Sequence, residues 1–186
     1  MRKIVAGLFV TLDGVTEEPN DWMGPYFSPE IGQAVGSLMA AQDAMLLGRV
    51  TYEGFAAYWP QQSGEMADTM NGTPKYVVSG TLASASWQNT TPIRAAGAAG
   101  EIAALKEQAG GNIGMTGSAT LLAWLLRQGL LDELNLLLFP VIVGRGKRLF
   151  SGEGSAAGLR LARSAAFSTG VVHLVYTPDS EGAHHA

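Results

Sequence analysis

Apolar positions recur along the chain in two patterns, one typical of buried strands and one typical of helices packed on one face. Residues 3–11 are apolar on both faces, as expected for a central strand of a sheet. Short apolar runs bounded by turn residues predict further strands at 44–47, 75–79, 91–94, 112–116 and 133–143.

Helical patterns lie between these strands. Ser28 can cap a helix with Pro29 at its first position, and a buried stripe follows from Ile31 to Met39. Similar spacing predicts a brief helix over 52–59 that ends at Pro60, and longer ones over 102–109 and 118–128. The last of these is apolar almost all round and should be deeply buried. The aromatic-rich segment 15–27 and the polar segment 61–73 are predicted to be loops.

Two further runs, 158–166 and 171–176, are separated by turn residues and predict a closing hairpin. Strands that alternate with helices and end in a hairpin predict an α/β fold, with a mostly parallel central sheet, a C-terminal antiparallel hairpin and helices on both faces. We expect one domain over 1–178 and a disordered tail over 179–186.

Composition adds an expectation about assembly and location. Only 15% of the residues are charged while 47% are hydrophobic, so we expect some apolar surface to be covered by a second copy in a homodimer. The net charge of −4 and the scattered basic residues argue against a nucleic-acid partner. The longest apolar run, 134–143, is too short for a membrane span, so we expect a soluble, cytoplasmic protein.

Several kinds of site are excluded by residue type. The chain has no cysteine, so thiolate nucleophiles, disulfides and zinc–thiolate sites are absent. Of its three histidines, His184 and His185 lie in the tail, and His173 falls on a predicted strand. No metal site is therefore expected, and the phosphate-loop and nucleophile-elbow patterns are missing too.

Two strand-to-helix junctions remain as candidate anion sites. Gly48, Arg49 and Thr51 follow one strand, and Gly117, Ser118 and Ala119 follow another. The first backbone N–H groups of a helix attract anions, and an arginine adds a fork of donors that matches phosphate. Each junction alone can also be an ordinary capped turn. Together on one sheet they suit a molecule with phosphates at two places, such as NADPH.

Motifs at 11–14, 47–52, 75–82, 111–118, 131–134 and 140–150 occur in this order along the chain. Because of this ordered set of motifs, the chain resembles the reductase domain of the bifunctional riboflavin-biosynthesis deaminase–reductase, in a stand-alone form. The resemblance covers residues 1–178. The resemblance implies a dihydrofolate-reductase-like fold, NADPH as cofactor and often a homodimer. It also implies hydride transfer to a small heterocyclic or sugar-derived acceptor, as in 5-amino-6-(5-phosphoribosylamino)uracil reductase.

The resemblance also implies roles for individual residues. Arg49 and Thr51 would meet the adenosine 2′-phosphate, with Gly48 as a further cofactor-binding residue of the same junction. Gly117, Ser118 and Ala119 would meet the pyrophosphate. The remaining implied residues are Ser79 and Leu82 beside the adenosine, Gly144 and Gly146 near the nicotinamide, and Asp13 at the substrate pocket.

The acceptor side leaves alternatives open. Asp13 can orient the acceptor or relay a proton, or it can be a turn-forming residue of its Asp-Gly pair. Glu133 is a second candidate or a polar strand entry, and Trp22 covers the substrate or packs under its loop.

We expect a stand-alone reductase domain without the deaminase domain, and the loop after Asp13 does not match the expected sugar-phosphate-binding pattern. Two other functions remain. One is a non-catalytic nucleotide-binding module on the same fold. The other is dihydrofolate-type pterin reduction, for which the first long helix offers only Glu30.

Overall fold

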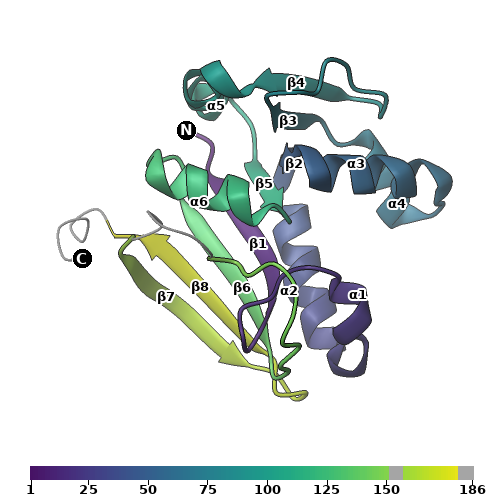
Figure 1. Ribbon diagram of the computed structural model, residues 1–186, viewed down its shortest axis with the longest axis vertical. Coiled ribbons are helices and arrows are strands. Elements are labelled where there is room, and N and C mark those ends of the chain that lie inside the picture. The colour runs from purple at the N-terminus through teal and green to yellow at the C-terminus, as the bar shows by residue number, and fades with distance from the viewer. Residues whose placement is uncertain (151–156, 180–186) are drawn as a thin grey trace.

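The computed structural model describes residues 1–150 and 157–179, and its centre is one eight-stranded sheet (Figure 1). The strand order is β4-β3-β2-β5-β1-β6-β8-β7. The strands are β1 Ile4–Thr11, β2 Gln42–Gly48, β3 Lys75–Ser79, β4 Thr90–Arg94, β5 Asn112–Thr116, β6 Glu133–Phe139, β7 Leu159–Ala166 and β8 Val172–Pro178. Strands β1 to β6 pair in parallel, and β8 pairs antiparallel with both β6 and β7. The predicted mostly parallel sheet with a closing hairpin is confirmed.

Helices cover both faces of this sheet, as predicted. They are α1 Pro19–Trp22, α2 Pro29–Ala40, α3 Arg49–Tyr58, α4 Glu65–Gly72, α5 Ala98–Glu107 and α6 Ala119–Arg127, with short 3-10 turns at Gly24–Tyr26, Trp59–Gln61 and Ala95–Gly97. Buried residues of α5 and α6 share one core cluster with Ile4, Ala6 and Leu8 of β1. Leu38 of α2 lies against Gly7 on the opposite face of the same strand, because side chains alternate along a strand. Figure 1 shows α6 and α2 on the two sides of β1.

The start of α2 matches the expectation from sequence. The Ser28 hydroxyl accepts a hydrogen bond from the Ile31 amide at 3.4 Å, and Pro29 occupies the first turn. Ile31 is fully buried, and the rest of the stripe is half-buried against the sheet. Capping and one-sided burial together fix where this helix begins and how it faces the sheet.

The loop predicted over 61–73 is wrong, because residues Glu65–Gly72 form helix α4. Gly64 precedes it with φ +103° and offers no side-chain cap, so the usual sequence signal for a helix start is missing. Ala67 and Met70 are its buried residues, a stripe too short to stand out in a polar segment. The loop predicted over 15–27 likewise contains α1 and a 3-10 turn.

A buried lysine ties α4 to the sheet. Lys75 is fully buried, and its Nζ donates to the carbonyl oxygens of Asn71, Thr73 and Gln88 at 3.0, 2.7 and 3.2 Å. The ammonium also lies 4.2 Å from the centre of the Trp87 ring. Burial lowers the pKa of Lys75 to about 8, so the group still carries its three donor hydrogens at neutral pH.

Two other predictions need correction. The strand predicted over 133–143 ends at Phe139, because Pro140 has no N–H to continue the ladder. Helix α6 is buried on one face, through Leu121, Leu122 and Leu125, while Trp124 is half-buried.

The predicted disordered tail and the two tail histidines fall almost wholly on 180–186, outside the described residues, and the domain limits at 178 stay a prediction. Within 1–150 and 157–179, no helix has both the length and the apolar character that crossing a bilayer requires. The cytoplasmic location stays a prediction.

Candidate functional site

A cleft of about 770 Å³ opens at the carboxyl ends of β2, β3 and β5. This is where ligands of parallel sheets gather, and the volume lies within the range of cofactor sites. Most of the cofactor residues predicted from sequence line the cleft: Gly48, Arg49, Thr51, Ser79, Gly117, Ser118 and Ala119. The remaining wall comes from Gly7 to Phe9 of β1, from Trp124 of α6 and from two loops.

The two strand-to-helix junctions interlock. A side chain at Gly48 would collide with the Ser118 hydroxyl, and a Cβ at Gly117 would lie 2.6 Å from Thr51 Oγ1. The Ser118 amide donates to Thr51 Oγ1 at 3.1 Å, which joins the second junction to the first. Thr51 therefore positions the neighbouring junction, in addition to lining the cleft where a 2′-phosphate contact was predicted. We call this assembly of 48–51 and 116–119 the junction wall.

Two helices begin at the junction wall. Helix α3 starts at Arg49 and α6 at Ala119, and the Ser118 hydroxyl caps α6 by accepting from the Leu121 amide at 3.3 Å. Among the described residues, the amides of Ala119 and Thr120 have no acceptor, as is usual in the first turn of a helix. These donors and the positive ends of the two helix dipoles make the junction wall suited to a diphosphate.

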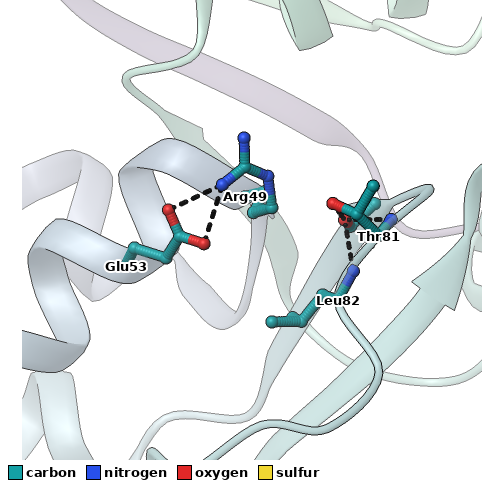
Figure 2. Close-up of polar contacts among 5 residues, drawn as sticks. Arg49, Glu53, Thr81 and Leu82 are labelled. Carbon is teal, nitrogen blue, oxygen red and sulfur yellow. Dashed lines mark hydrogen bonds and ion pairs between the residues drawn. The ribbon is translucent and has the colours of Figure 1, made fainter.

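Arg49 carries the positive charge at this end of the cleft. Its Nη1 donates to both carboxylate oxygens of Glu53, at 2.8 and 2.9 Å, and its side chain is 44% exposed (Figure 2).

After β3 the chain turns beside Arg49. Ser79 Oγ accepts from the amides of Thr81 and Leu82 at 3.0 and 2.9 Å. Leu82 does not line the cleft. Its half-buried side chain packs against the core cluster of Met45, Leu47, Tyr52, Met70, Val77 and Trp87.

The opposite end is formed by two loops, 12–18 and 140–149, which we call the loop wall. Val15 and Arg148 form an antiparallel bridge, and the Thr16 amide donates to the Lys147 carbonyl at 3.0 Å. Glu17 accepts from the Lys147 amide at 2.9 Å and pairs with its Nζ at 3.1 Å. These bonds to Lys147 lower the pKa of Glu17.

Asp13 stabilises the loop wall through hydrogen bonds and does not line the cleft. Its carboxylate accepts from the Val143 amide at 3.2 Å, the Gly144 amide at 2.9 Å and the Thr11 hydroxyl at 2.6 Å. The hydrogen bonds from Thr11 and from the loop lower the pKa of Asp13 to about 2. Gly144 and Gly146 have φ of +76° and +103° and shape this loop without lining the cleft.

Two other predicted residues lie away from the cleft. Trp22 is buried, its indole N–H donates to the Glu17 carbonyl at 2.9 Å, and its ring packs on Phe139 at 5.2 Å. Glu133 begins β6, at the end of the sheet opposite the cleft, and accepts from the Asn135 amide group at 2.8 Å. Trp22 thus packs under its loop, and Glu133 opens its strand, as their alternative interpretations had it.

Sequence reasoning missed Thr16, Glu17 and Lys147, and also Phe9, Trp124 and Arg127 of the lining. Lys147 stands in one of the motifs of the resemblance, which was the available signal for that residue. No sequence pattern pairs Glu17 with Lys147, because they are 130 positions apart. Over the part of the chain that the structure describes, no three His, Asp or Glu side chains are grouped to hold a metal ion.

Known proteins share the sequence and the fold. The uncharacterized protein YyaP of Bacillus subtilis strain 168 is 30% identical over 187 residues, with 94% of each chain covered. A putative riboflavin biosynthesis protein from Shewanella sp. PV-4 has a similar structure, with a TM-score of 0.75 at 18% identity and 96% and 99% of the two chains covered. Dihydrofolate reductase from Enterococcus faecalis, solved with NADP(H), aligns with a TM-score of 0.64 at 13% identity, over 95% of this chain and 96% of that one.

A model of the RibD C-terminal domain matches residues 2–173, nearly the whole chain. The similar structures support the dihydrofolate-reductase-like fold expected from the sequence. The match covers both the junction wall and the loop wall, so the whole cleft lies inside it. The chain belongs to the RibD C-terminal domain family.

Proposed function

We propose that this protein is an NADPH-dependent reductase of the riboflavin-pathway type. The observation that carries the proposal is the junction wall, where two helix starts and Arg49 face one cleft. The family and the fold shared with an NADP(H)-bound dihydrofolate reductase support a reductase of this class. Its acceptor is a small heterocyclic or sugar-derived molecule, of the kind that 5-amino-6-(5-phosphoribosylamino)uracil represents.

The residues present fit such a cofactor. Gly48 and Gly117 let the side chains of Ser118 and Thr51 pack directly on the backbone, which holds the two helix starts together. The amides of Ala119 and Thr120 are donors for the diphosphate. Arg49 can grip a 2′-phosphate with its guanidinium fork. Bound NADPH supplies the hydride, and the chain supplies orientation and shelter from water.

A reduction also requires a proton, and the loop wall offers its source. Among the described residues, the ionisable side chains that line the cleft are Glu17, Arg49, Arg127 and Lys147, and arginine does not release protons in proteins. Asp13 stays charged at neutral pH and lies outside the lining, so it serves as an anchor of the loop. We therefore assign proton donation to Lys147 Nζ, which Glu17 holds in place.

Pterin reduction fits less well. Glu30, the carboxylate at the start of α2, accepts hydrogen bonds from the amide and the hydroxyl of Ser168 in the turn before β8. Glu30 is thus hydrogen-bonded to the closing hairpin and does not line the cleft.

The test is NADPH oxidation with a panel of pyrimidine, sugar-derived and pterin acceptors, alongside Arg49→Ala. The variant should lose roughly 1.5–3 kcal/mol of NADPH binding, because a charged hydrogen-bond partner is removed, and little of its NADH binding. Both cofactors can be titrated by fluorescence. Equal weakening of the two would remove Arg49 from this role, and tight binding with no turnover on any acceptor would favour the non-catalytic module.

The protein is also proposed to form a homodimer through the sheet face of β6, β8 and β7. Leu136 and Leu138 of β6 are only half-buried, and Leu161 of the edge strand β7 is 50% exposed. Light scattering should report about twice the 19.5 kDa chain mass, and Leu161→Arg should lower it. Met66→Arg on α4 is the matched control, since Met66 is 48% exposed. A monomeric wild type, or equal effects of the two variants, would contradict this interface.

A further inference from the structure

Glu53 is the carboxylate nearest to the charge that the proposed cofactor site depends on. It lies one turn after Arg49 on α3, and both of its oxygens accept from Arg49 Nη1, at 2.8 and 2.9 Å (Figure 2). The two side chains are 44% and 48% exposed, so the pair sits at the surface. Arg49 lines the cleft, whereas Glu53 lines a neighbouring hollow with Tyr52 and Ser86.

This pairing leaves Arg49 only partly available to a ligand. Among the described residues, Nε and Nη2 of Arg49 have no acceptor, while Nη1 is taken by Glu53. A 2′-phosphate that binds the free edge of the guanidinium comes to lie close to a carboxylate. One that uses Nη1 must first displace that carboxylate. In both arrangements Glu53 opposes the binding of a dianion, by repulsion or by competition.

The Glu53 carboxylate does not oppose the binding of a ribose 2′-hydroxyl. A ribose 2′-hydroxyl is a donor and carries no charge, so it meets no repulsion from Glu53 and can donate to it. Of the side chains that line the cleft, Glu17 alone is a carboxylate among the described residues, and it belongs to the opposite end. Glu53 is therefore the acidic group at the arginine end that can separate the two nicotinamide cofactors.

We propose that Glu53 is a specificity-determining residue that narrows the preference for NADPH over NADH, an inference that rests on the proposed function. Arg49 attracts the 2′-phosphate of NADPH, and Glu53 weakens that attraction without opposing the 2′-hydroxyl of NADH. The cofactor preference is then set by the pair, and Arg49 alone would discriminate more strongly.

Titration of the full chain with NADPH and with NADH, followed by fluorescence, tests the proposal. Glu53→Gln keeps the size of the side chain and should tighten NADPH binding about three- to tenfold, because it removes an exposed ion pair and a repulsive charge. NADH affinity should stay the same or fall. The gain should vanish in about 1 M salt, where screening acts within about 3 Å.

Two further variants serve as controls for these titrations. In an Arg49→Ala background, Glu53→Gln should tighten NADPH binding less, because there is no guanidinium left to release and only the direct repulsion between Glu53 and the phosphate is removed. Glu65→Gln, in the first turn of α4, removes an equal charge and should change neither affinity. An unchanged NADPH affinity, or equal gains for both cofactors, would overturn the role of Glu53 while leaving the proposed function intact. A wild type that binds neither cofactor would overturn the proposed function, and this inference with it.

Discussion

The two walls of the cleft are built by different kinds of contact. The junction wall brings together residues 48–51 and 116–119 by close packing, with Gly48 beneath Ser118 and Gly117 beneath Thr51. The loop wall joins 12–18 to 140–149 by polar contacts, such as those from Asp13 to residues 130 and 131 positions away. The first tolerates no added atom, because backbone meets side chain directly.

The two kinds of contact suit the two walls to different parts of the ligands. A steric fit between two closely packed strand ends gives a rigid surface, which suits a part of the ligand that never varies. Exposed hydrogen bonds and ion pairs between loops exchange with water and adjust more easily. We infer that the junction wall serves the cofactor and that the loop wall serves the acceptor, on which relatives of one fold differ most.

The largest effect is expected from Gly117→Ala, which breaks the junction wall. Gly117 has φ +67°, and a Cβ there would lie 2.6 Å from Thr51 Oγ1, so both strain and overlap arise. The free energy of unfolding should fall by roughly 2–4 kcal/mol in urea denaturation, and NADPH binding should be lost.

Gly129→Ala is its matched control. Gly129 has φ +64°, but no heavy atom lies within 4 Å of an added Cβ. This variant should show the strain alone, about 1 kcal/mol, with cofactor binding intact. Equal losses in the two variants would mean that the interlock with Thr51 contributes nothing.

A smaller, local effect is expected from Asp13→Asn in the loop wall. The amide keeps one acceptor oxygen where the carboxylate offers two, so the amides of Val143 and Gly144 can no longer both be satisfied. Hydrogen exchange at these two amides should become faster, with NADPH affinity unchanged. Asp21→Asn, on the exposed side of α1, controls for loss of charge.

The effect of Asp13 also has a defined pH dependence. The folded protein lowers the pKa of Asp13 from 3.8 to about 2, so its contribution to stability is present above pH 3.8 and is lost as the pH falls through 2. The difference between wild type and Asp13→Asn should shrink over that interval. A difference that is constant with pH would show that the charge of Asp13 has no part in holding the loop.

The smallest effect on stability is expected from Lys147→Gln. Its side chain is 77% exposed, and exposed ion pairs contribute little, so the free energy of unfolding should not change measurably. Turnover on a validated acceptor should nevertheless fall by about 10²-fold or more if Nζ donates the proton. Arg145→Gln, exposed on the same loop and outside the lining, should keep its turnover. Equal turnover in both variants would leave the proton to another source.

The same contrast explains what could be predicted from the sequence. The junction wall consists of two short motifs, each of which shows its chemistry within four residues, and the structure places them in one cleft. The loop wall depends on contacts between segments far apart in the sequence, so no local pattern could pair Glu17 with Lys147. Helix α4 escaped prediction for a related reason. Its C-terminal carbonyl oxygen at Asn71 is satisfied by Lys75, which belongs to the following strand.

The interlock of the two junctions has a consequence for how this sequence can vary over evolution. Gly48 has an ordinary backbone conformation, φ −82°, so the obstacle to an added Cβ there is its overlap with the Ser118 side chain and not backbone strain. Because the Ser118 Cβ would itself lie 2.9 Å from a Cβ at 48, a substitution at 48 should be accepted only in lineages that already have glycine at 118. If the change at 118 comes first, neither replacement creates an overlap. If the change at 48 comes first, its Cβ overlaps with the Ser118 side chain. The replacement at 48 thus depends on an earlier replacement at 118, and reconstructed ancestors of the family should show the two changes in that order.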